Sequence, residues 1–569
     1  MTRHRTVPEV PPVATAMLFL LIVLLPLSVE GSEAPSLQVE PVALLLPGGD
    51  GGELVENPAL REATGPNTYL TAAAVAPWDR SRIVVATTFH GIFESRDGGR
   101  SWIDLGETGE IAALYQGDGF YEDISAVAYD PRDRDALWVE SAQTGVIDRI
   151  DRRTGTFVAT AGTTPVETGR RAIAASVRAP QPEFPVLDDA ARERRRRAAD
   201  HVSFYLSPWQ MEPEVLEQHM AFAEEHGFTA VVIDFKDDFG RIAYNSELSF
   251  HNEIGAVRSY FDARRVIDTV HEHGLYLIAR VVVFKDRELA EYDDGRYSVW
   301  DGRRSVPWGV FREELDPESG EPFVRQVEHW VDPFSEFVWD YNIEIATELE
   351  RLGVDEVQFD YIRTPSDGLT RDIEYRFRAD SPALVENDPF RDDRVEALSM
   401  FLSRAREAIS IPLGVDVFGF NGWYRMSYLG QDIALLARYV DVISPMLYPS
   451  HFPREFRGDL GYLDWAEMIY REGVARGRRI TGDHVLIRPY VQSFLIGGEL
   501  DFETPYYSEY LQRQIKGTLE AGGSGFTLWN FSGRYYMVEG GLWLPGVLRS
   551  EPSRTGVSVP GPGRTRRTS

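Results

Sequence analysis

The chain has 569 residues, of which 43% are hydrophobic and 12% aromatic, enough for two or three globular domains with a large core. Asp and Glu outnumber Lys and Arg by 89 to 59, and the net charge of −30 opposes binding to nucleic acid or anionic lipid. There is no cysteine, which excludes disulfides, thiolate metal sites and a cysteine nucleophile.

The N-terminus has the layout of a secretory signal peptide. Arg3 and Arg5 precede the apolar run Met17–Leu27, and small residues follow between Ser28 and Ser32. The run is shorter than the ~20 apolar residues that span a bilayer. We therefore expect residues 1–31 to be removed on export and the mature protein to be secreted or periplasmic, without stable membrane insertion. An uncleaved anchor is the alternative.

Residues 32–160 are predicted to form a small all-β module. The segment S-R-D-G-G-R-S-W at Ser95–Trp102 resembles the Asp-box of sialidase-type β-propellers, in which the Asp and the glycines hold a hairpin turn. A second unit echoes the first, since Ala126–Ala128 repeats Ala74–Ala76 at an offset of 52 residues. A closed propeller has at least four blades, so this propeller-like module is a fragment, an accessory unit, or half of an assembly completed by another chain.

Two further segments are predicted to lie outside globular domains. Residues 161–199 form a Pro-containing linker that ends in the basic run Arg192–Arg197, which is typical of a solvated helix face rather than a nucleic-acid site. Residues 547–569 contain Pro, Gly, Ser and Arg with few apolar residues, and we expect a disordered tail.

Strand-like and helix-like segments alternate between residues 200 and 546. The eight predicted strands are Val202–Trp209, Thr229–Phe235, Leu275–Phe284, Val354–Tyr361, Ile411–Phe418, Val440–Tyr448, Val485–Val491 and Gly525–Asn530. Helix signals separate them, including a cap at Asp262 and an N-cap at Asp332 followed by Pro333. This pattern predicts an α/β fold, a closed eight-stranded parallel β/α (TIM) barrel. An open doubly wound sheet is second, because no Gly-rich turn follows the early strands.

Three of these strands carry an aspartate late in the strand and on the side away from the helices. Strand alternation places Asp234, Asp360 and Asp416 opposite the apolar residues that face the helices. The chemistry of a parallel β/α barrel lies at the carboxyl ends of its strands. Two carboxylates across a cleft are the minimum for glycoside hydrolysis, and Asp360 and Asp416 come from neighbouring strands, so they can flank one bond.

Other polar and aromatic residues at the predicted mouth suit substrate binding. Asp234 and Lys236 are predicted to line a second wall, where the lysine keeps the acid ionised and suited to a sugar hydroxyl. The remaining candidates for substrate binding are Arg363, Tyr448, Trp529, Trp300 and Trp308. The last two lie in a long insertion after the third strand and suit stacking on sugar rings. The alternative is that they only pack the insertion onto the barrel.

Other catalytic classes fit less well, and we expect no metal and no cofactor. His271 and His273 are two residues apart, which places their rings on different sides of a helix and makes a poor zinc chelate. G-G-S-G at Gly522–Gly525 is a turn rather than the G-x-S-x-G motif of serine hydrolases.

The strand segments V-V-I-D-F-K-D, V-Q-F-D-Y-I-R, G-V-D-V-F-G and D-V-I-S-P-M-L-Y-P-S resemble a bacterial family of glycoside hydrolases with a TIM-barrel domain. That family is distantly similar to the retaining α-amylase and α-galactosidase groups, and the resemblance covers roughly His201–Leu544. It implies a nucleophile at Asp360. In amylase-like enzymes the acid/base follows strand five, where this chain has Asp416. In galactosidase-like enzymes it follows strand six, where the chain has Tyr448 and no carboxylate closer than Glu455.

The sequence thus predicts a secreted glycoside hydrolase that cleaves a poly- or oligosaccharide with paired carboxylates and retains the anomeric configuration. The predicted partner is a carbohydrate substrate and not nucleic acid. The alternative from a different class is a glycan-binding or cell-envelope scaffold protein without catalysis. It would keep the aromatic residues at the mouth but would not need a matched pair of acids.

Overall fold

The computed structural model describes residues 70–87, 91–105, 124–141, 147–151 and 186–542, with short pieces between 43 and 63 and between 169 and 178. Gaps within the last range fall at 316–320, 384–392, 424–425, 427–428, 455 and 457–459. The predicted signal peptide, most of the predicted linker and the predicted tail lie outside the described residues. Among the described helices, none is both long enough and apolar enough to cross a membrane.

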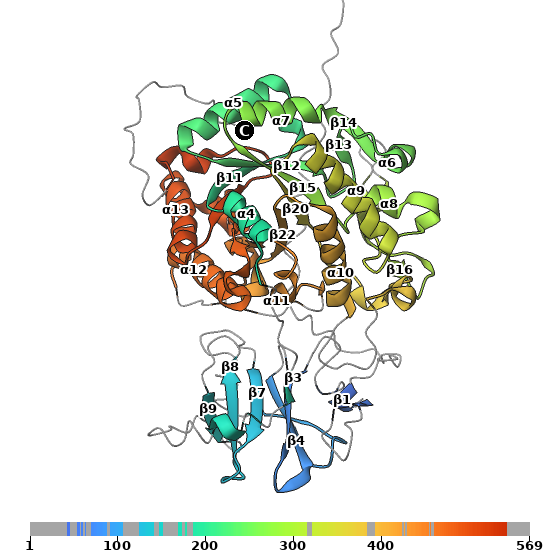
Figure 1. Ribbon diagram of the computed structural model, residues 1–569, viewed down its shortest axis with the longest axis vertical. Coiled ribbons are helices and arrows are strands. Elements are labelled where there is room, and N and C mark those ends of the chain that lie inside the picture. Colours follow the sequence, from blue (N-terminus) through green and yellow to red (C-terminus); the bar gives the residue numbers. More distant parts are fainter. Residues whose placement is uncertain are drawn as a thin grey trace, which may run out of the picture.

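Eight parallel strands close into a barrel, as predicted (Figure 1). In chain order they are β11 (His201–Leu206), β12 (Ala230–Lys236), β15 (Tyr276–Val282), β20 (Glu356–Asp360), β22 (Leu413–Phe418), β23 (Val442–Met446), the divided strand β24 (Leu486–Ile487) and β25 (Tyr490–Gln492), and β26 (Gly525–Trp529). The barrel is closed because β11 pairs in parallel with both β12 and β26.

The seventh strand is divided at Pro489, where the sequence predicted a continuous strand. Proline has no backbone N–H and cannot donate to the ladder. Its carbonyl still accepts a hydrogen bond from Thr527 N at 3.0 Å, and Arg488 N donates to Ile443 O at 3.0 Å. The backbone therefore keeps its contacts with both neighbouring strands across the break.

Helices surround the barrel (Figure 1). The long ones are α5 (Pro213–His226), α7 (Ala263–Glu272), α9 (Glu336–Leu352), α10 (Asp393–Ala408), α12 (Tyr462–Thr481) and α13 (Thr504–Glu520). The predicted cap of α7 is confirmed, since the Asp262 side chain accepts from Arg265 N at 2.8 Å.

The predicted N-cap at Asp332 is wrong. Helix α9 begins at Glu336, with Ser335 at the N-cap position. The two oxygens of Asp332 instead accept from Phe334 N at 2.9 Å and Phe377 N at 3.1 Å. The side chain therefore joins two loops, a role that depends on a partner 45 residues away in the sequence.

The basic run Arg192–Arg197 lies in helix α4 (Asp189–Ala198), at the amino-terminal end of the barrel (Figure 1). Arg194 Nε lies 3.1 Å from Asp441 Oδ1, and Arg197 Nη2 lies 3.5 Å from Asp355 Oδ1. These two aspartates directly precede β23 and β20. Two of the arginines therefore attach α4 to the barrel, where the sequence predicted a linker that ends at residue 199.

The strand alternation predicted from the sequence is observed. Val357 and Phe359 on β20 belong to the core between barrel and helices, while Gln358 and Asp360 point into the barrel. The barrel interior is strongly polar. At its amino-terminal end Glu356 and Arg488, both 0% exposed, form an ion pair.

The N-terminal part contains two small antiparallel sheets that share a core. The first is formed by β3 (Leu70–Ala76), β4 (Asp79–Thr87), β5 (Gly91–Ser95) and β6 (Ile103–Asp104), with β10 (Val177–Arg178) beside β3. The second is formed by β7 (Ile124–Tyr129), β8 (Ala136–Ser141) and β9 (Ile147–Asp151). The Trp78 and Tyr129 rings pack edge to face, 5.5 Å apart. The two sheets make an all-β region, and a propeller remains a prediction.

The turn between β5 and β6 is held by Asp97. Its Oδ1 accepts from Arg100 N at 3.0 Å and Ser101 N at 2.9 Å, and its Oδ2 accepts from Ser101 Oγ at 2.6 Å. The hydrogen bond from the Ser101 hydroxyl is the largest cause that lowers the pKa of Asp97, to about 2. Both carboxylate oxygens of Asp97 therefore accept hydrogen bonds within their own turn, which indicates a structural role.

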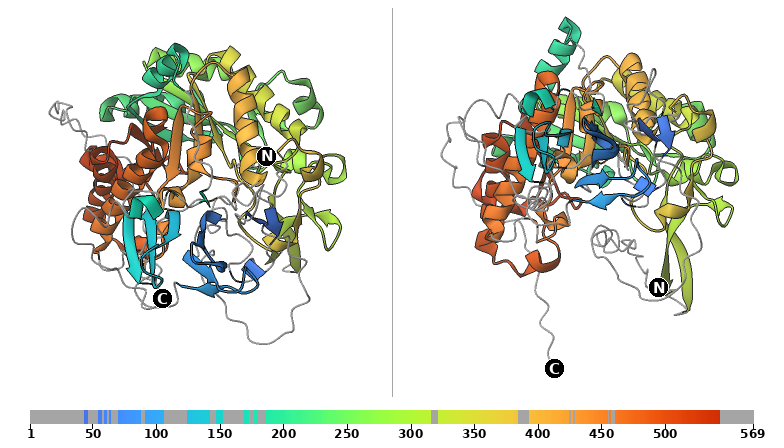
Figure 2. Two further views of the ribbon diagram at one scale, coloured as in Figure 1. Left: turned by 60° about the horizontal axis from the view of Figure 1, so that its bottom comes forward. Right: turned by 90° about the horizontal axis from the view of Figure 1, so that it is seen from below.

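Long insertions follow β12, β15 and β20 at the carboxyl-terminal end of the barrel, and the one after β20 contains β21 (Ile373–Glu374). The insertion after β12 contains β13 (Ile242–Tyr244), α6 (Ser249–Glu253) and β14 (Val257–Phe261). The insertion after β15 contains α8 (Arg287–Ala290), β16 (Trp300–Asp301), β17 (Val306–Pro307) and the hairpin β18 (Gly309–Leu315) and β19 (Pro322–His329). This hairpin projects away from the barrel (Figure 2, right).

Candidate active site

Three aspartates from three strands meet around one arginine inside the barrel, toward the carboxyl ends of the strands. Arg280 on β15 donates from Nη1 to Asp234 Oδ1 at 2.6 Å and from Nε to Asp360 Oδ2 at 3.0 Å. The same Nε lies 3.8 Å from Asp416 Oδ2. All four residues have an exposed fraction of 5% or less. The structure thus brings together the three aspartates that the sequence placed on the inner face.

Strand register explains this meeting. Asp234 on β12 lies opposite Arg280 on β15. Asp360 on β20 lies opposite Val282, which follows Arg280 on the inner face of β15. Arg280 therefore lies directly beside Asp234, and Asp360 lies one inner-face position closer to the carboxyl ends of the strands.

Asp416 is fully buried, and neither of its oxygens has a partner at normal hydrogen-bond geometry in the part of the chain that the structure describes. The Arg280 guanidinium and the Tyr490 hydroxyl still act on it and oppose a rise of its pKa. Burial of an ionised carboxylate without close hydrogen bonds is costly, which favours the protonated form. Burial raises the pKa of Asp416 well above its usual value, and the charge of Asp360 adds to the rise, whereas Arg280 opposes it. Burial and the neighbouring charge of Asp360 therefore both favour the protonated form of Asp416.

Asp360 is held in one orientation by both of its oxygens. Oδ2 accepts from Nε and Nη2 of Arg280, and Oδ1 accepts from Tyr361 N at 2.5 Å. Tyr361 has a φ of +52°, in the left-handed region that bulky side chains rarely adopt. Such strain persists only where surrounding contacts enforce it, and it concentrates at functional sites. Here two cations contact the Tyr361 ring: Lys285 Nζ lies 4.9 Å and Arg363 Cζ 5.2 Å from its centroid.

Two aromatic side chains form the wall behind Asp234. The Tyr205 hydroxyl donates to Asp234 Oδ2 at 2.6 Å. The Trp529 ring packs on Tyr205 with centroids 4.0 Å apart, and the Arg280 guanidinium lies 5.2 Å from the Trp529 centroid. Burial raises the pKa of Asp234, although Arg280 and the Tyr205 hydroxyl oppose this. Trp529, a predicted binding residue, thus contacts the aspartate cluster through Arg280.

Tyr448 and Tyr490 lie on the opposite side, near Asp416. Burial raises the pKa of the Tyr448 hydroxyl well above its usual value, and the charges of Asp416 and Asp360 contribute to this. The Tyr490 hydroxyl donates to Gln358 Oε1 at 2.6 Å. Both phenols therefore remain neutral hydrogen-bonding groups beside the acids.

Lys236 does not pair with Asp234 as the sequence suggested. Its Nζ lies 2.7 Å from Asp286 Oδ2 and donates to Val282 O at 2.7 Å and to Asn342 Oδ1 at 3.0 Å. The side chain is 0% exposed. The pairing of β12 with β15 contains a bulge between Asp234 and Lys236, so the two side chains point in different directions. The cation beside Asp234 is Arg280, and Lys236 attaches strand β12 to helix α9.

The three remaining predicted binding residues are packed by the structure. Arg363 is 5% exposed and lies over the rings of Trp330 and Phe418, at 4.6 and 4.7 Å. Trp308 is 2% exposed, so it cannot stack on a sugar ring in this conformation. Trp300 is half-buried, and the Arg376 guanidinium lies 3.9 Å from its ring centroid. The ring faces of Trp300 and Trp308 are thus occupied by contacts within the insertions, which the sequence alone does not reveal.

Sequence reasoning missed Arg280. A signal was present, because the residue interrupts an apolar strand at the parity of the inner face, in Y-L-I-A-R-V-V. It also missed Asp237, in the loop after β12, where burial raises the pKa to about 7 and the charge of Asp238 adds to the effect. No group of three or more His, Asp or Glu residues is arranged for a metal ion in the described ranges. In the aspartate cluster itself, Arg280 takes the position of a cation.

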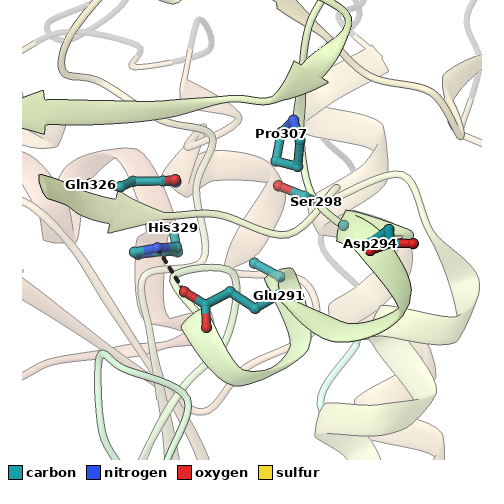
Figure 3. Close-up of a pocket in the computed structure, with 8 residues that line it drawn as sticks. Glu291, Asp294, Ser298, Pro307, Gln326 and His329 are labelled. Carbon is teal, nitrogen blue, oxygen red and sulfur yellow. Dashed lines mark ion pairs between the residues drawn. The ribbon is translucent and has the colours of Figure 1, made fainter. Parts of the chain in front are cut away.

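A separate cavity of about 320 Å³ lies in the insertion after β15 (Figure 3). Its lining residues are Ala290, Glu291, Asp294, Gly295, Ser298, Pro307, Gln326 and His329. Glu291 Oε1 lies 3.2 Å from His329 Nε2, and burial lowers the pKa of this histidine. The aspartates around Arg280 do not line this cavity. The candidate active site is the aspartate cluster, because it contains the neighbouring carboxyl groups that glycoside hydrolysis requires.

Among solved structures, a hypothetical protein from Ruminiclostridium thermocellum is 28% identical, with 38% of this chain and 97% of that chain covered and a TM-score of 0.30. The PgaB (BpsB) glycoside hydrolase domain from Bordetella bronchiseptica is 14% identical, with 58% and 94% covered and a TM-score of 0.39. Trehalulose synthase MutB from Pseudomonas mesoacidophila is 13% identical, with 60% and 65% covered and a TM-score of 0.34. These TM-scores are too low to carry an argument about activity.

No curated protein matches the chain. A family model, in contrast, matches residues 203–535, which are more than half of the chain and include the whole aspartate cluster. The chain belongs to the family described as "Putative glycosyl hydrolase domain".

Proposed function

We propose that the protein is a retaining glycoside hydrolase that acts on a poly- or oligosaccharide, with Asp360 as the nucleophile and Asp416 as the acid/base. The observation that carries the proposal is the different environment of two neighbouring carboxyl groups. Asp360 is held by a guanidinium and a backbone N–H, whereas Asp416 is buried without a partner at normal hydrogen-bond geometry among the described residues. Pairs of acids with opposed environments are how such enzymes assign the two roles.

The reaction then proceeds in two steps. In the first, a carboxylate oxygen of Asp360 forms a bond to the anomeric carbon while Asp416 gives its proton to the leaving glycosidic oxygen, whose bond to that carbon breaks. In the second, the Asp416 carboxylate takes a proton from water, and the resulting oxygen attacks the anomeric carbon and releases Asp360. Asp416 ends protonated again, so the cycle closes without a cofactor.

The spacing of the carboxyl groups supports retention. Arg280 Nε lies 3.0 Å from Asp360 Oδ2 and 3.8 Å from Asp416 Oδ2, so the two oxygens are at most about 6.8 Å apart, the sum of these distances. Retaining enzymes place their carboxyl groups about 5–5.5 Å apart, and inverting enzymes about 6.5–9.5 Å. This limit, which applies to one pair of oxygens, favours the shorter spacing of retaining enzymes.

The test compares wild type with Asp360→Asn and Asp416→Asn on a panel of polysaccharides and aryl glycosides. We expect Asp360→Asn to lower kcat by several powers of ten on every substrate, since no nucleophile remains. Asp416→Asn should lose activity on polysaccharides. On aryl glycosides with acidic leaving groups it should keep much of the first step, measured as kcat/KM, because these groups depart without protonation. Its kcat should still fall, because hydrolysis of the covalent intermediate lacks its base. Asp340 lies on α9 and forms an exposed ion pair with Arg404 on α10, so Asp340→Asn is the matched control and should be fully active.

Product stereochemistry, followed by NMR during hydrolysis, tests retention directly. First-formed product of inverted configuration would exclude the covalent intermediate.

A second candidate function is glycan binding without hydrolysis. The observation that favours it is the tight packing of the cluster, in which Asp234, Arg280 and Asp360 are 5% exposed or less. Hydrolysis that is absent across the panel, together with glycan binding that survives in Asp360→Asn, would establish this function instead.

A further inference from the structure

Two exposed aromatic rings lie together at the mouth of the barrel. Trp209 is 64% exposed and Tyr260 is 37% exposed, and their ring centroids are 4.8 Å apart at an interplanar angle of 43°. Trp209 belongs to the short 3-10 turn η3 (Pro208–Gln210) that follows β11, and Tyr260 lies on β14 in the insertion after β12. Because β11 and β12 are paired neighbours, both rings lie at the carboxyl-terminal end of the barrel, where the aspartates also lie.

The chain presents Tyr260 through an irregular edge strand. Val257 and Phe261 of β14 pair with Ile242 and Tyr244, so four steps on β14 face two steps on β13. Ser259, inside this bulge, has a φ of +48°, which is unfavourable for a residue other than glycine. Bulges redirect side chains, and backbone strain of this kind concentrates at functional sites. Phe261, the residue after Tyr260, packs in the core again.

Trp209 is carried by an anchored turn. The side chain of Gln210 accepts from Ser207 N at 2.7 Å and donates to Ser532 O at 3.4 Å. On the other side, Arg265 Nη2 donates to Met211 O at 2.7 Å. The turn that carries Trp209 is therefore anchored, while the indole itself stays exposed. This is unusual, since tryptophan is highly buried on average.

The position of the rings relates them to the aspartate cluster. Trp209 is four residues after Tyr205, whose hydroxyl contacts Asp234, so their Cα atoms are within about 14 Å. A single polysaccharide chain can span this distance and contact both Trp209 and the aspartate cluster. The net charge of −30 and the carboxyl groups at the mouth oppose a polyanion.

We propose that Trp209 and Tyr260 form a stacking platform for a sugar ring of a non-acidic polysaccharide, at a subsite separate from the bond to be cleaved. The flat, partly polar faces of Trp and Tyr can contact the apolar face of a pyranose ring while its hydroxyls remain in water. The platform deepens the proposed hydrolase function and rests on it. It makes the enzyme select polymers over short glycosides.

The test is native affinity electrophoresis of the full chain in gels that contain starch, xylan, galactomannan or the polyanion alginate. All variants carry Asp360→Asn, so that the polymer is not degraded. We expect retardation by at least one neutral polymer and none by alginate. Trp209→Ala and Tyr260→Ala should each weaken binding at least about fivefold, as expected from the loss of an aromatic stacking contact.

Three controls separate the platform from a folding defect. Trp209→Tyr keeps a flat ring and should restore most of the binding. Ile103→Ala removes an exposed apolar side chain from the β region and should bind like the parent. The melting temperature of each variant should stay close to that of the parent, because both rings are exposed.

Hydrolysis is measured separately, in chains that carry the wild-type Asp360. On the polymer that is bound, Trp209→Ala should raise KM with little change in kcat, and on short aryl glycosides it should change neither. Undiminished polymer binding by both alanine variants would overturn the platform while leaving the hydrolase intact. Retardation that needs the two rings, without any hydrolysis by wild type, would support the platform's contact with polymer and refute the proposed activity. Absence of retardation by every polymer, or retardation by alginate alone, would overturn the platform.

Discussion

At the scale of single residues, one arginine decides the electrostatics of the candidate site. Arg280 contacts two of three buried aspartates directly and lies 3.8 Å from the third. Burial by itself lowers the pKa of this arginine, but Asp234 and Asp360 outweigh it, and its pKa is raised. The guanidinium therefore stays charged and offsets part of the charge of its neighbours.

We expect Arg280→Met to lower the free energy of unfolding by about 3–5 kcal/mol, because it leaves buried carboxylates without their cation. Urea unfolding near neutral pH measures the change. Arg404→Met, which breaks exposed ion pairs with Glu336 and Asp340, is the control and should cost less than about 1 kcal/mol. Equal effects of the two substitutions would contradict the role given to Arg280.

Asp416 predicts a pH dependence of stability. Its pKa is ordinary in the unfolded chain and raised in the folded protein, so the folded state binds the extra proton between these two values. The contribution of this group to the free energy of unfolding therefore falls as the pH rises above about 3.8. Asp416→Asn does not titrate, and its stability relative to wild type should increase from pH 4.5 to pH 8.

Chemical denaturation at several pH values gives this difference. A flat profile for Asp416→Asn would mean that Asp416 is ionised in the folded protein, and its role as acid would fail.

At the scale of elements, the barrel closes where β26 meets β11. Gly525 begins β26 with a φ of +81° and lies opposite His201. A Cβ at this position would lie 1.9 Å from His201 O, closer than any atomic contact allows. Only glycine permits the two strands to approach so closely.

We expect Gly525→Ala to destabilise the protein by at least about 2 kcal/mol, from the left-handed backbone and the overlap together. Thermal or urea unfolding of the full chain measures the loss. Gly498→Ala is the matched control, since no atom lies within 4 Å of its added Cβ, and it should change stability by no more than about 0.5 kcal/mol. A neutral result for Gly525→Ala would mean that the closure can adjust at small cost.

At the scale of the whole molecule, the barrel region includes helix α4. Asp441 accepts from Arg194 Nε at 3.1 Å and from Arg406 Nη1 at 2.7 Å, and Ala198 O accepts from Arg488 Nη1 at 3.3 Å. Removal of α4 would leave part of this buried network without partners. We therefore expect the boundary of the folding unit to lie before residue 189, whereas the sequence predicted it at residue 200.

Two fragments test this boundary. We expect residues 186–546 to unfold cooperatively without the β region, since the eight strands and their helices are self-contained. Residues 200–546 should melt at least about 2 °C lower, or aggregate, because the ion pairs of α4 are lost. Identical melting curves would show that α4 adds nothing, and a non-cooperative melt of 186–546 would show that the barrel needs the β region.

Local sequence patterns were enough to predict the barrel and the face on which three aspartates lie. Both depend on local patterns: alternation along a strand, periodicity along a helix and caps such as Asp262, which act between residues a few positions apart. These patterns were strong over residues 200–546. The predicted strand at Val485–Val491 failed only where Pro489 removes a donor.

Tertiary structure decided which side chains face one another across the barrel and which loop aromatics stay exposed. The pairing of Arg280 with Asp234 and Asp360 depends on strand register, and the capture of Lys236 by Asp286 depends on a bulge. Trp308 is buried and Trp209 exposed, although both follow strands at the mouth, because packing by distant insertions covers one and not the other. Such contacts join residues tens of positions apart, and no local pattern encodes them.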